Sequence, residues 1–228
     1  MEWSEGGEGV TAPYYMAALD LNRRRCVIIG GGVVAERKIE ALLESGAEIT
    51  VICPDPSPAI EQRAAAFEIT LFRRPYRFGD LESAWLAVAA TDSRDTNHHV
   101  YEEAAQRRML INTVDSLQEC NFVVPAVLNR GDIRIAVTSG GQSPVLAQRA
   151  RDEIAKVIGP EYGRLAELLG ACRREVHRLV PDASDRRALW SQMASTESLD
   201  LVRRGDDAEV HDRVIEHARK IGSGVTTG

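Results

Sequence analysis

Short apolar runs alternate with amphipathic stretches through the first half of the chain. Five apolar runs have the length of a β-strand: residues 25–30, 48–53, 69–72, 85–90 and 110–113. The stretches between them that carry apolar residues at helical spacing are 34–45, 57–66 and 94–107. The nearly unbroken apolar run 85–90 is typical of a strand buried on both faces of a parallel sheet. This alternation predicts a Rossmann-like, doubly wound α/β domain, in which ligands bind at the carboxyl ends of the strands.

The pattern changes after residue 115. Two β runs, 122–128 and 133–137, are separated only by the turn-forming residues 129–132, which predicts an antiparallel hairpin. A helix is expected over 144–158, and apolar residues continue at helical spacing beyond it, with further helices over 185–193 and 207–221. We therefore expect three segments: a parallel-sheet domain over 1–115, an antiparallel β segment over 116–143, and a helical domain over 144–228. Flexible tails are expected over 1–12 and 222–228.

Composition narrows the class of protein. The 228 residues are 44% hydrophobic and 27% charged, as expected of a globular protein with a substantial core. The net charge of −6 argues against a nucleic-acid partner, and the apolar runs are too short to span a bilayer. The N-terminus lacks the basic and apolar regions of a secretory signal. The four cysteines are scattered, which favours free thiols in a reducing cytoplasm over disulfides or a zinc site.

A glycine-rich turn joins the first predicted strand to the first predicted helix. Gly30 permits a tight turn, and Gly32 lacks the Cβ that would keep the backbone away from a pyrophosphate. The helix then begins at Val33 and Val34, whose backbone N–H groups and positive helix end favour bound phosphate. Ala35 fills the third small position of the dinucleotide fingerprint. The alternative is an ordinary glycine turn in an α/β protein that binds no nucleotide.

Residues that follow the other strands complete a predicted NAD site. Pro54 and Asp55 come after the second strand, where many NAD-binding folds place an acidic residue on the ribose hydroxyls. Asp55 favours NAD over NADP, although it is equally a turn residue of the Pro-Asp-Pro segment. Thr91 and Asp92 come after the fourth strand and are expected beside the nicotinamide ribose, or else as caps of the next helix.

Several segments together resemble the precorrin-2 dehydrogenases and the N-terminal part of bifunctional siroheme synthases. The resemblance extends over about residues 12–220, and the most specific segment is 139–147. The other matching segments are 27–32 with 34–38, 89–92, 112–115 and 122–126. The family oxidises precorrin-2 to sirohydrochlorin with NAD, in siroheme or cobalamin synthesis. Some members also insert ferrous iron, and members are homodimers. The resemblance implies these properties here, with 116–143 as the dimerisation segment and a tetrapyrrole as substrate.

The resemblance also implies two groups of site residues. Asp115 matches the aspartate that the family uses as its acid–base group, and a carboxylate there can accept the released proton. Otherwise Asp115 is a solvated loop residue. Ser139, Gly140 and Gly141 precede a helix and can form a concave set of N–H donors for substrate carboxylates. Ser139 also matches a serine that can be phosphorylated in the family. The alternative for this segment is an ordinary helix cap.

Two other functions stay open at this point. The first adds sirohydrochlorin ferrochelatase activity at Asp115, and the second is a non-catalytic NAD-sensing module. His98 and His99 are adjacent on a predicted helix, so they face different directions and do not have the spacing of metal ligands. We therefore assign no metal ligands and interpret both as surface residues. The methyltransferase module of bifunctional siroheme synthases is expected to lie outside these residues.

Overall fold

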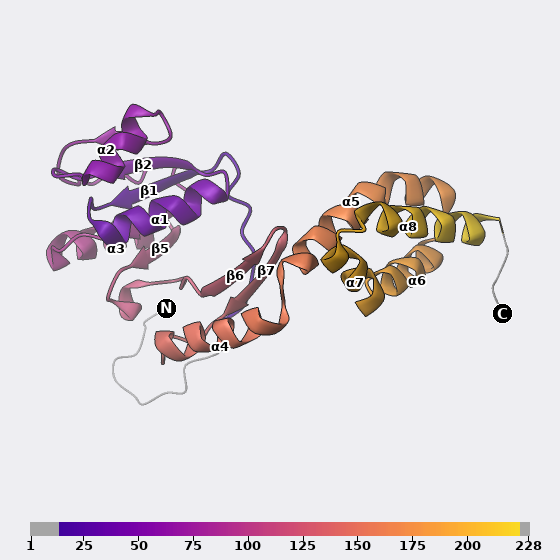
Figure 1. The fold of residues 1–228 in the computed structure, drawn as a ribbon. Coiled ribbons are helices and arrows are strands. Elements are labelled where there is room, and N and C mark those ends of the chain that lie inside the picture. Colours follow the sequence, from indigo (N-terminus) through magenta and orange to yellow (C-terminus); the bar gives the residue numbers. More distant parts are fainter. Residues whose placement is uncertain (1–13, 224–228) are drawn as a thin grey trace. The chain divides into compact units, whose positions relative to one another are not determined.

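The computed structural model describes residues 14–223, and their backbone divides into two compact units (Figure 1). The first unit runs to Val124 and the second begins at Pro125. The tail expected over 1–12 lies outside the described residues, as do residues 224–228. Each unit has its own hydrophobic core, so each is described by itself.

The first unit is built on a five-stranded parallel sheet with the order β3-β2-β1-β4-β5. Its strands are β1 (Arg25–Ile29), β2 (Glu48–Ile52), β3 (Thr70–Phe72), β4 (Leu86–Ala89) and β5 (Leu110–Thr113). Its helices are α1 (Val33–Glu44), α2 (Pro58–Ala65) and α3 (Arg94–Gln106). The strand order reverses between β1 and β4, which is the position at which doubly wound sheets bind ligands. The predicted Rossmann-like class is confirmed.

Helices cover both faces of this sheet. Side chains of β1 alternate in direction, so Ile28 packs on the face covered by α1 and α2, and Val27 packs on the face covered by α3. Ile39 of α1 and Val100 of α3 are fully buried in these two cores. The unbroken apolar character of β4 follows from this arrangement, because all four of its residues are buried.

The second unit combines a hairpin with helices. Strands β6 (Ala126–Arg130) and β7 (Ile133–Val137) pair antiparallel. The helices are α4 (Pro144–Val157), α5 (Pro160–Leu179), α6 (Ala183–Met193), α7 (Thr196–Arg204) and α8 (Asp207–Gly222). Val176 of α5, Leu189 of α6 and Val214 of α8 are fully buried in one core. No helix within residues 14–223 is long and apolar enough to cross a membrane.

Several boundaries of the second unit differ from the sequence prediction. Strand β6 begins at Ala126 rather than at residue 122, since Pro125 has no N–H to donate to a partner strand. The turn is only Gly131–Asp132, with Gly131 at φ +59°, because two-residue hairpin turns match the twist of the strands. Helix α8 continues to Gly222, where fraying was expected. The short helix α7 was not predicted as a separate element.

Candidate functional site

The glycine turn between β1 and α1 is packed closely on its neighbours. Gly30 has φ +131° and donates its N–H to the Ile52 carbonyl at 3.0 Å. A Cβ on Gly30 would lie 2.1 Å from the carbonyl oxygen of Ala90. A Cβ on Gly31 would lie 2.8 Å from the Cys53 sulfur. Both positions therefore need glycine for packing, whereas the sequence motif indicated only a tight turn at Gly30 and no role for Gly31.

Gly32 differs from the two glycines before it. A Cβ at Gly32 would meet no atom within 4 Å, and its φ of −93° suits any residue. Gly32 is the N-cap of α1 but offers no side chain to the free N–H groups of the first turn. Open space above a helix N-terminus is the arrangement that binds phosphate groups.

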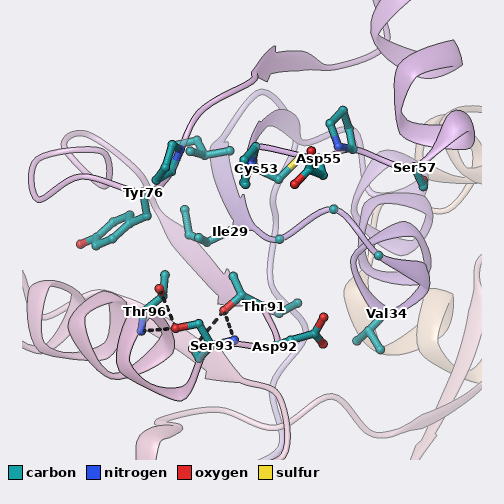
Figure 2. A pocket seen from close by; sticks show the side chains of 18 of the residues that line it. Ile29, Val34, Cys53, Asp55, Ser57, Tyr76, Thr91, Asp92, Ser93 and Thr96 are labelled. Carbon is teal, nitrogen blue, oxygen red and sulfur yellow. Dashed lines mark hydrogen bonds between the residues drawn. The ribbon is translucent and has the colours of Figure 1, made fainter.

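A cavity of about 720 Å³ opens over this turn, and we call it the dinucleotide cavity. Figure 2 shows Cys53, Asp55 and Ser57 along one side of it, and Thr91, Asp92 and Ser93 along the opposite side. All residues predicted to bind the cofactor line it: Gly30, Gly32, Val33, Val34, Pro54, Asp55, Thr91 and Asp92. The residues come from three loops at the carboxyl edge of the sheet. The structure thus brings the predicted set together around one cavity.

A second cavity of about 610 Å³ shares Thr91 and Asp92 with the first. Asp115 follows β5, lines this second cavity and has φ +62°. The other charged residues that line it are Asp92, Arg94, Asp95, His98 and Glu119. We call this space the acidic cavity. The structure therefore places Asp115 in a cavity next to the dinucleotide cavity, with one short turn forming the wall between them.

Asn97 fixes the turn that separates the two cavities. Its side chain is 7% exposed. Its Oδ1 accepts the Thr91 hydroxyl at 2.8 Å and the Thr91 N–H at 3.2 Å, and its Nδ2 donates to the Thr91 carbonyl at 2.9 Å. Sequence reasoning missed this residue. The local signal available was a polar side chain in the first turns of a helix directly after Thr91.

His98 and His99 face different cavities, as their adjacent positions predict. His99 lines the dinucleotide cavity and His98 lines the acidic cavity. The His98 Nδ1 lies 2.8 Å from a carboxylate oxygen of Glu119, and this hydrogen bond raises the pKa of His98 above its ordinary value. Among the described residues, no three His, Cys, Asp or Glu side chains are grouped so that they could hold a metal ion.

A buried carboxylate holds another wall of the dinucleotide cavity. Glu103 of α3 is fully buried and accepts the Tyr76 hydroxyl, the Gly79 N–H at 2.9 Å and the Leu81 N–H at 3.3 Å. Arg107 pairs with it at 2.7 Å. Burial, followed by the hydrogen bond to Glu103, raises the pKa of Tyr76. Tyr76 lines the cavity, so its hydrogen bond to Glu103 fixes part of a wall that the sequence motifs did not indicate.

The segment Ser139–Gly141 belongs to the second unit. Gly140 and Gly141 have φ of +64° and +84°. Its hydrogen bonds are largely internal, because Gly140 donates to Thr138 and the Ser139 hydroxyl accepts the Ser143 N–H at 2.8 Å. Ser143 in turn caps α4. Within the described residues, the N–H groups of Ser139 and Gly141 have no protein acceptor. These two N–H groups are therefore the donors left for the predicted anion site.

The parallel sheet, the glycine turn and the cavity above it define an NAD(P)-binding α/β protein. Family models agree and extend over most of the chain. A "Putative NAD(P)-binding" model matches residues 17–126. A "Sirohaem biosynthesis protein central" model matches 130–156, and a "Sirohaem synthase dimerisation region" model matches 161–217. A nicotinamide dinucleotide is therefore the cofactor class of the first unit.

Known proteins with similar sequences are siroheme synthases. The chain is 35% identical over 196 residues to a siroheme synthase of Photobacterium profundum, covering 86% of this chain and 42% of that protein. It is 32% identical over 205 residues to siroheme synthase 1 of Serratia proteamaculans, covering 90% and 43%. The chain thus spans less than half the length of these relatives.

A solved structure agrees with these relatives. The structure titled "SirC, precorrin-2 dehydrogenase" superposes with a TM-score of 0.76 at 26% identity, covering 89% of this chain and all of that one. The chain belongs to the siroheme synthase family, of which it carries the NAD(P)-binding, central and dimerisation regions. The dimerisation model falls on α5 to α8, within the helical domain expected over 144–228, and the assignment of 116–143 as a dimerisation segment stays a prediction.

Proposed function

We propose that the chain catalyses the NAD-dependent oxidation of precorrin-2 to sirohydrochlorin. One observation carries the proposal: the dinucleotide cavity and the acidic cavity share the Thr91–Asp92 wall. A cofactor in the first and a tetrapyrrole in the second would meet at that wall, beside Asp115. The names of the similar proteins, siroheme synthase and precorrin-2 dehydrogenase, supply the substrate class.

The first unit holds the dinucleotide through backbone and carboxylate groups. The N–H groups at the start of α1 bind the pyrophosphate over the open surface of Gly32. Asp55 lies exposed after β2 and accepts hydrogen bonds from the ribose hydroxyls, which favours NAD because a 2′-phosphate would be repelled. The nicotinamide, when bound, supplies the acceptor for the hydride that leaves the substrate.

Asp115 takes up the proton that the macrocycle releases. Oxidation removes two electrons and one proton as hydride from carbon, together with a second proton. An exposed carboxylate in the acidic cavity accepts that second proton and passes it to solvent. The hydride and the proton therefore leave toward different sides of the shared wall, the hydride toward the dinucleotide cavity and the proton toward Asp115.

The remaining parts of the proposal concern partners. The N–H groups of Ser139 and Gly141 bind carboxylates of the tetrapyrrole, a substrate that carries eight of them. The proposed assembly is a homodimer, which the match to a dimerisation region supports. The negative net charge of −6 argues against nucleic acid as a partner. A cytoplasmic location follows from the reducing environment that four scattered free cysteines favour.

The test follows NADH formation from precorrin-2 and NAD, with Asp115→Asn compared to the wild type. Asparagine tolerates a positive φ, so the fold is kept. The rate should fall by about 10²- to 10⁴-fold while NAD affinity is unchanged. Asp20→Asn is the matched control, since Asp20 is an exposed aspartate of the same unit that lines neither cavity. NAD binding without NADH formation in the wild type would instead favour a sensing module.

A further inference from the structure

One sulfur atom bridges the two ends of the turn that carries Asp115. Cys120 follows the short 3₁₀ helix η1 (Leu117–Glu119), and its Sγ returns to the end of β5. The sulfur lies 3.1 Å from the Thr113 nitrogen, 3.2 Å from the Thr113 carbonyl oxygen and 3.1 Å from the Ser116 carbonyl oxygen. It accepts the Thr113 N–H and donates its single hydrogen to one of two carbonyls, that of Thr113 or that of Ser116, which lie on either side of Asp115.

Few backbone hydrogen bonds hold this turn besides the sulfur contacts. Asp115 has φ +62°, a left-handed conformation that aspartate tolerates better than most residues but less well than glycine. The backbone bond across the turn, from the Ser116 N–H to the Thr113 carbonyl, is long at 3.4 Å. The bond from the Val114 N–H to the Ala89 carbonyl, at 2.9 Å, fixes the start of the turn, and the bond from the Glu119 N–H to the Ser116 carbonyl, at 3.2 Å, supports its far side.

The chemical state of Cys120 suits this role. The side chain is half-buried, and the cysteine forms no disulfide. Burial raises the pKa of the Cys120 thiol, so the group keeps its hydrogen at neutral pH and remains a donor to the carbonyls. The side-chain amide of Asn112 also contacts the sulfur, with its Nδ2 at 3.6 Å.

We propose that Cys120 is a positioning residue that holds the Asp115 carboxylate in the acidic cavity. Its effect on turnover rests on the proposed function, in which Asp115 accepts the substrate proton. Its effect on the conformation of Asp115 does not, because the sulfur contacts exist without substrate. Cys120 itself lines neither of the two cavities, so it acts through the turn rather than on a ligand.

The kinetic test compares Cys120→Ala and Cys120→Ser. The alanine variant should lose about 10- to 100-fold in kcat, because a misplaced catalytic group costs that much. Its dissociation constant for NAD should be unchanged. The serine variant keeps a donor and acceptor at the same position and should recover much of kcat. Cys172→Ala is the matched control, since Cys172 is a buried free cysteine of the second unit.

A double-mutant cycle and a ligand-free measurement separate the two proposals. Once Asp115 is replaced by asparagine, Cys120→Ala should reduce the remaining rate no further. Carboxyl-carbon NMR of the ligand-free protein should show the Asp115 resonance displaced in Cys120→Ala, with the Asp95 resonance unmoved. An unmoved Asp115 resonance, or an alanine variant with wild-type kcat, overturns the positioning role. A displaced resonance in a protein that fails to oxidise precorrin-2 overturns the proposed function alone.

Discussion

The same substitution at two glycines of one turn should give opposite phenotypes. In Gly30→Ala, the new Cβ must move about 1.3 Å away from the Ala90 carbonyl to reach the 3.4 Å at which ordinary contact begins. That carbonyl belongs to the chain leaving β4, whose Ala90 N–H donates to the Ile29 carbonyl at 2.7 Å. Relief of the clash therefore pulls apart the two central strands of the sheet.

The expected cost for Gly30→Ala combines two contributions. A non-glycine residue at φ +131° costs about 1–3 kcal/mol, and overpacking of a tight contact costs about 1–3 kcal/mol more. A loss of ~4 kcal/mol lowers the melting temperature of a protein of this size by roughly 8–16 °C. Circular dichroism during heating measures the shift.

Gly32→Ala should leave the fold intact and remove cofactor binding. Its φ of −93° suits alanine and its Cβ meets no protein atom within 4 Å, so stability should change by less than about 1 kcal/mol. The Cβ occupies the space over the helix N-terminus, and NAD affinity should fall by at least about tenfold in calorimetry, equivalent to ~1.4 kcal/mol. Wild-type affinity in Gly32→Ala, or wild-type melting in Gly30→Ala, would refute the reasoning.

Three other substitutions and one control test the surroundings of the cavities. Asn97→Asp turns the amide that donates to the Thr91 carbonyl into a carboxylate that repels it, and the calorimetric NAD dissociation constant should rise about tenfold. Asn121→Asp is the control, because the Asn121 amide bridges two backbone groups and lines neither cavity. This variant should leave the NAD dissociation constant unchanged. Glu119→Gln should lower the pKa of His98 toward its ordinary value in an NMR titration. Because the folded-state pKa is raised, this ion pair stabilises the wild type below the ordinary pKa of histidine, and the advantage disappears as pH rises through the raised value. A stability difference independent of pH would contradict this. Glu103→Ala should cost about 3–5 kcal/mol in urea unfolding, since it leaves buried donors unpaired, and a smaller loss than ~1 kcal/mol would show that water replaces the carboxylate.

The sequence predicted those parts of the site that depend on local patterns. Strand ends, the glycine turn and the positions of Asp55 and Thr91 follow from periodicity, since parallel strands bring their carboxyl ends to one edge. Gly31 was not interpreted, because its need for glycine comes from the Asp55 carbonyl and the Cys53 sulfur, which belong to residues more than twenty positions away. Tyr76 was missed for the same reason, because a buried carboxylate of a distant helix holds it.

Element boundaries failed where one residue outweighed the pattern. The apolar run 122–128 has strand character, but Pro125 delays the pairing of β6 to Ala126. The roles of Asp115 and of Ser139–Gly141 came from resemblance to a family, not from periodicity. The structure places Asp115 next to the dinucleotide cavity, and its role as an acid–base group remains a prediction.

The Thr91–Asp92 turn has a consequence for changing this protein by design or by selection. Two residues form a boundary common to both compartments, and the amide of Asn97 holds the backbone of the first of them, Thr91. A mutation introduced there to alter preference for one ligand necessarily reshapes the room left for the other. Variation that tunes one ligand alone should therefore accumulate at outlying positions such as Pro54 and Glu119, each of which borders a single compartment.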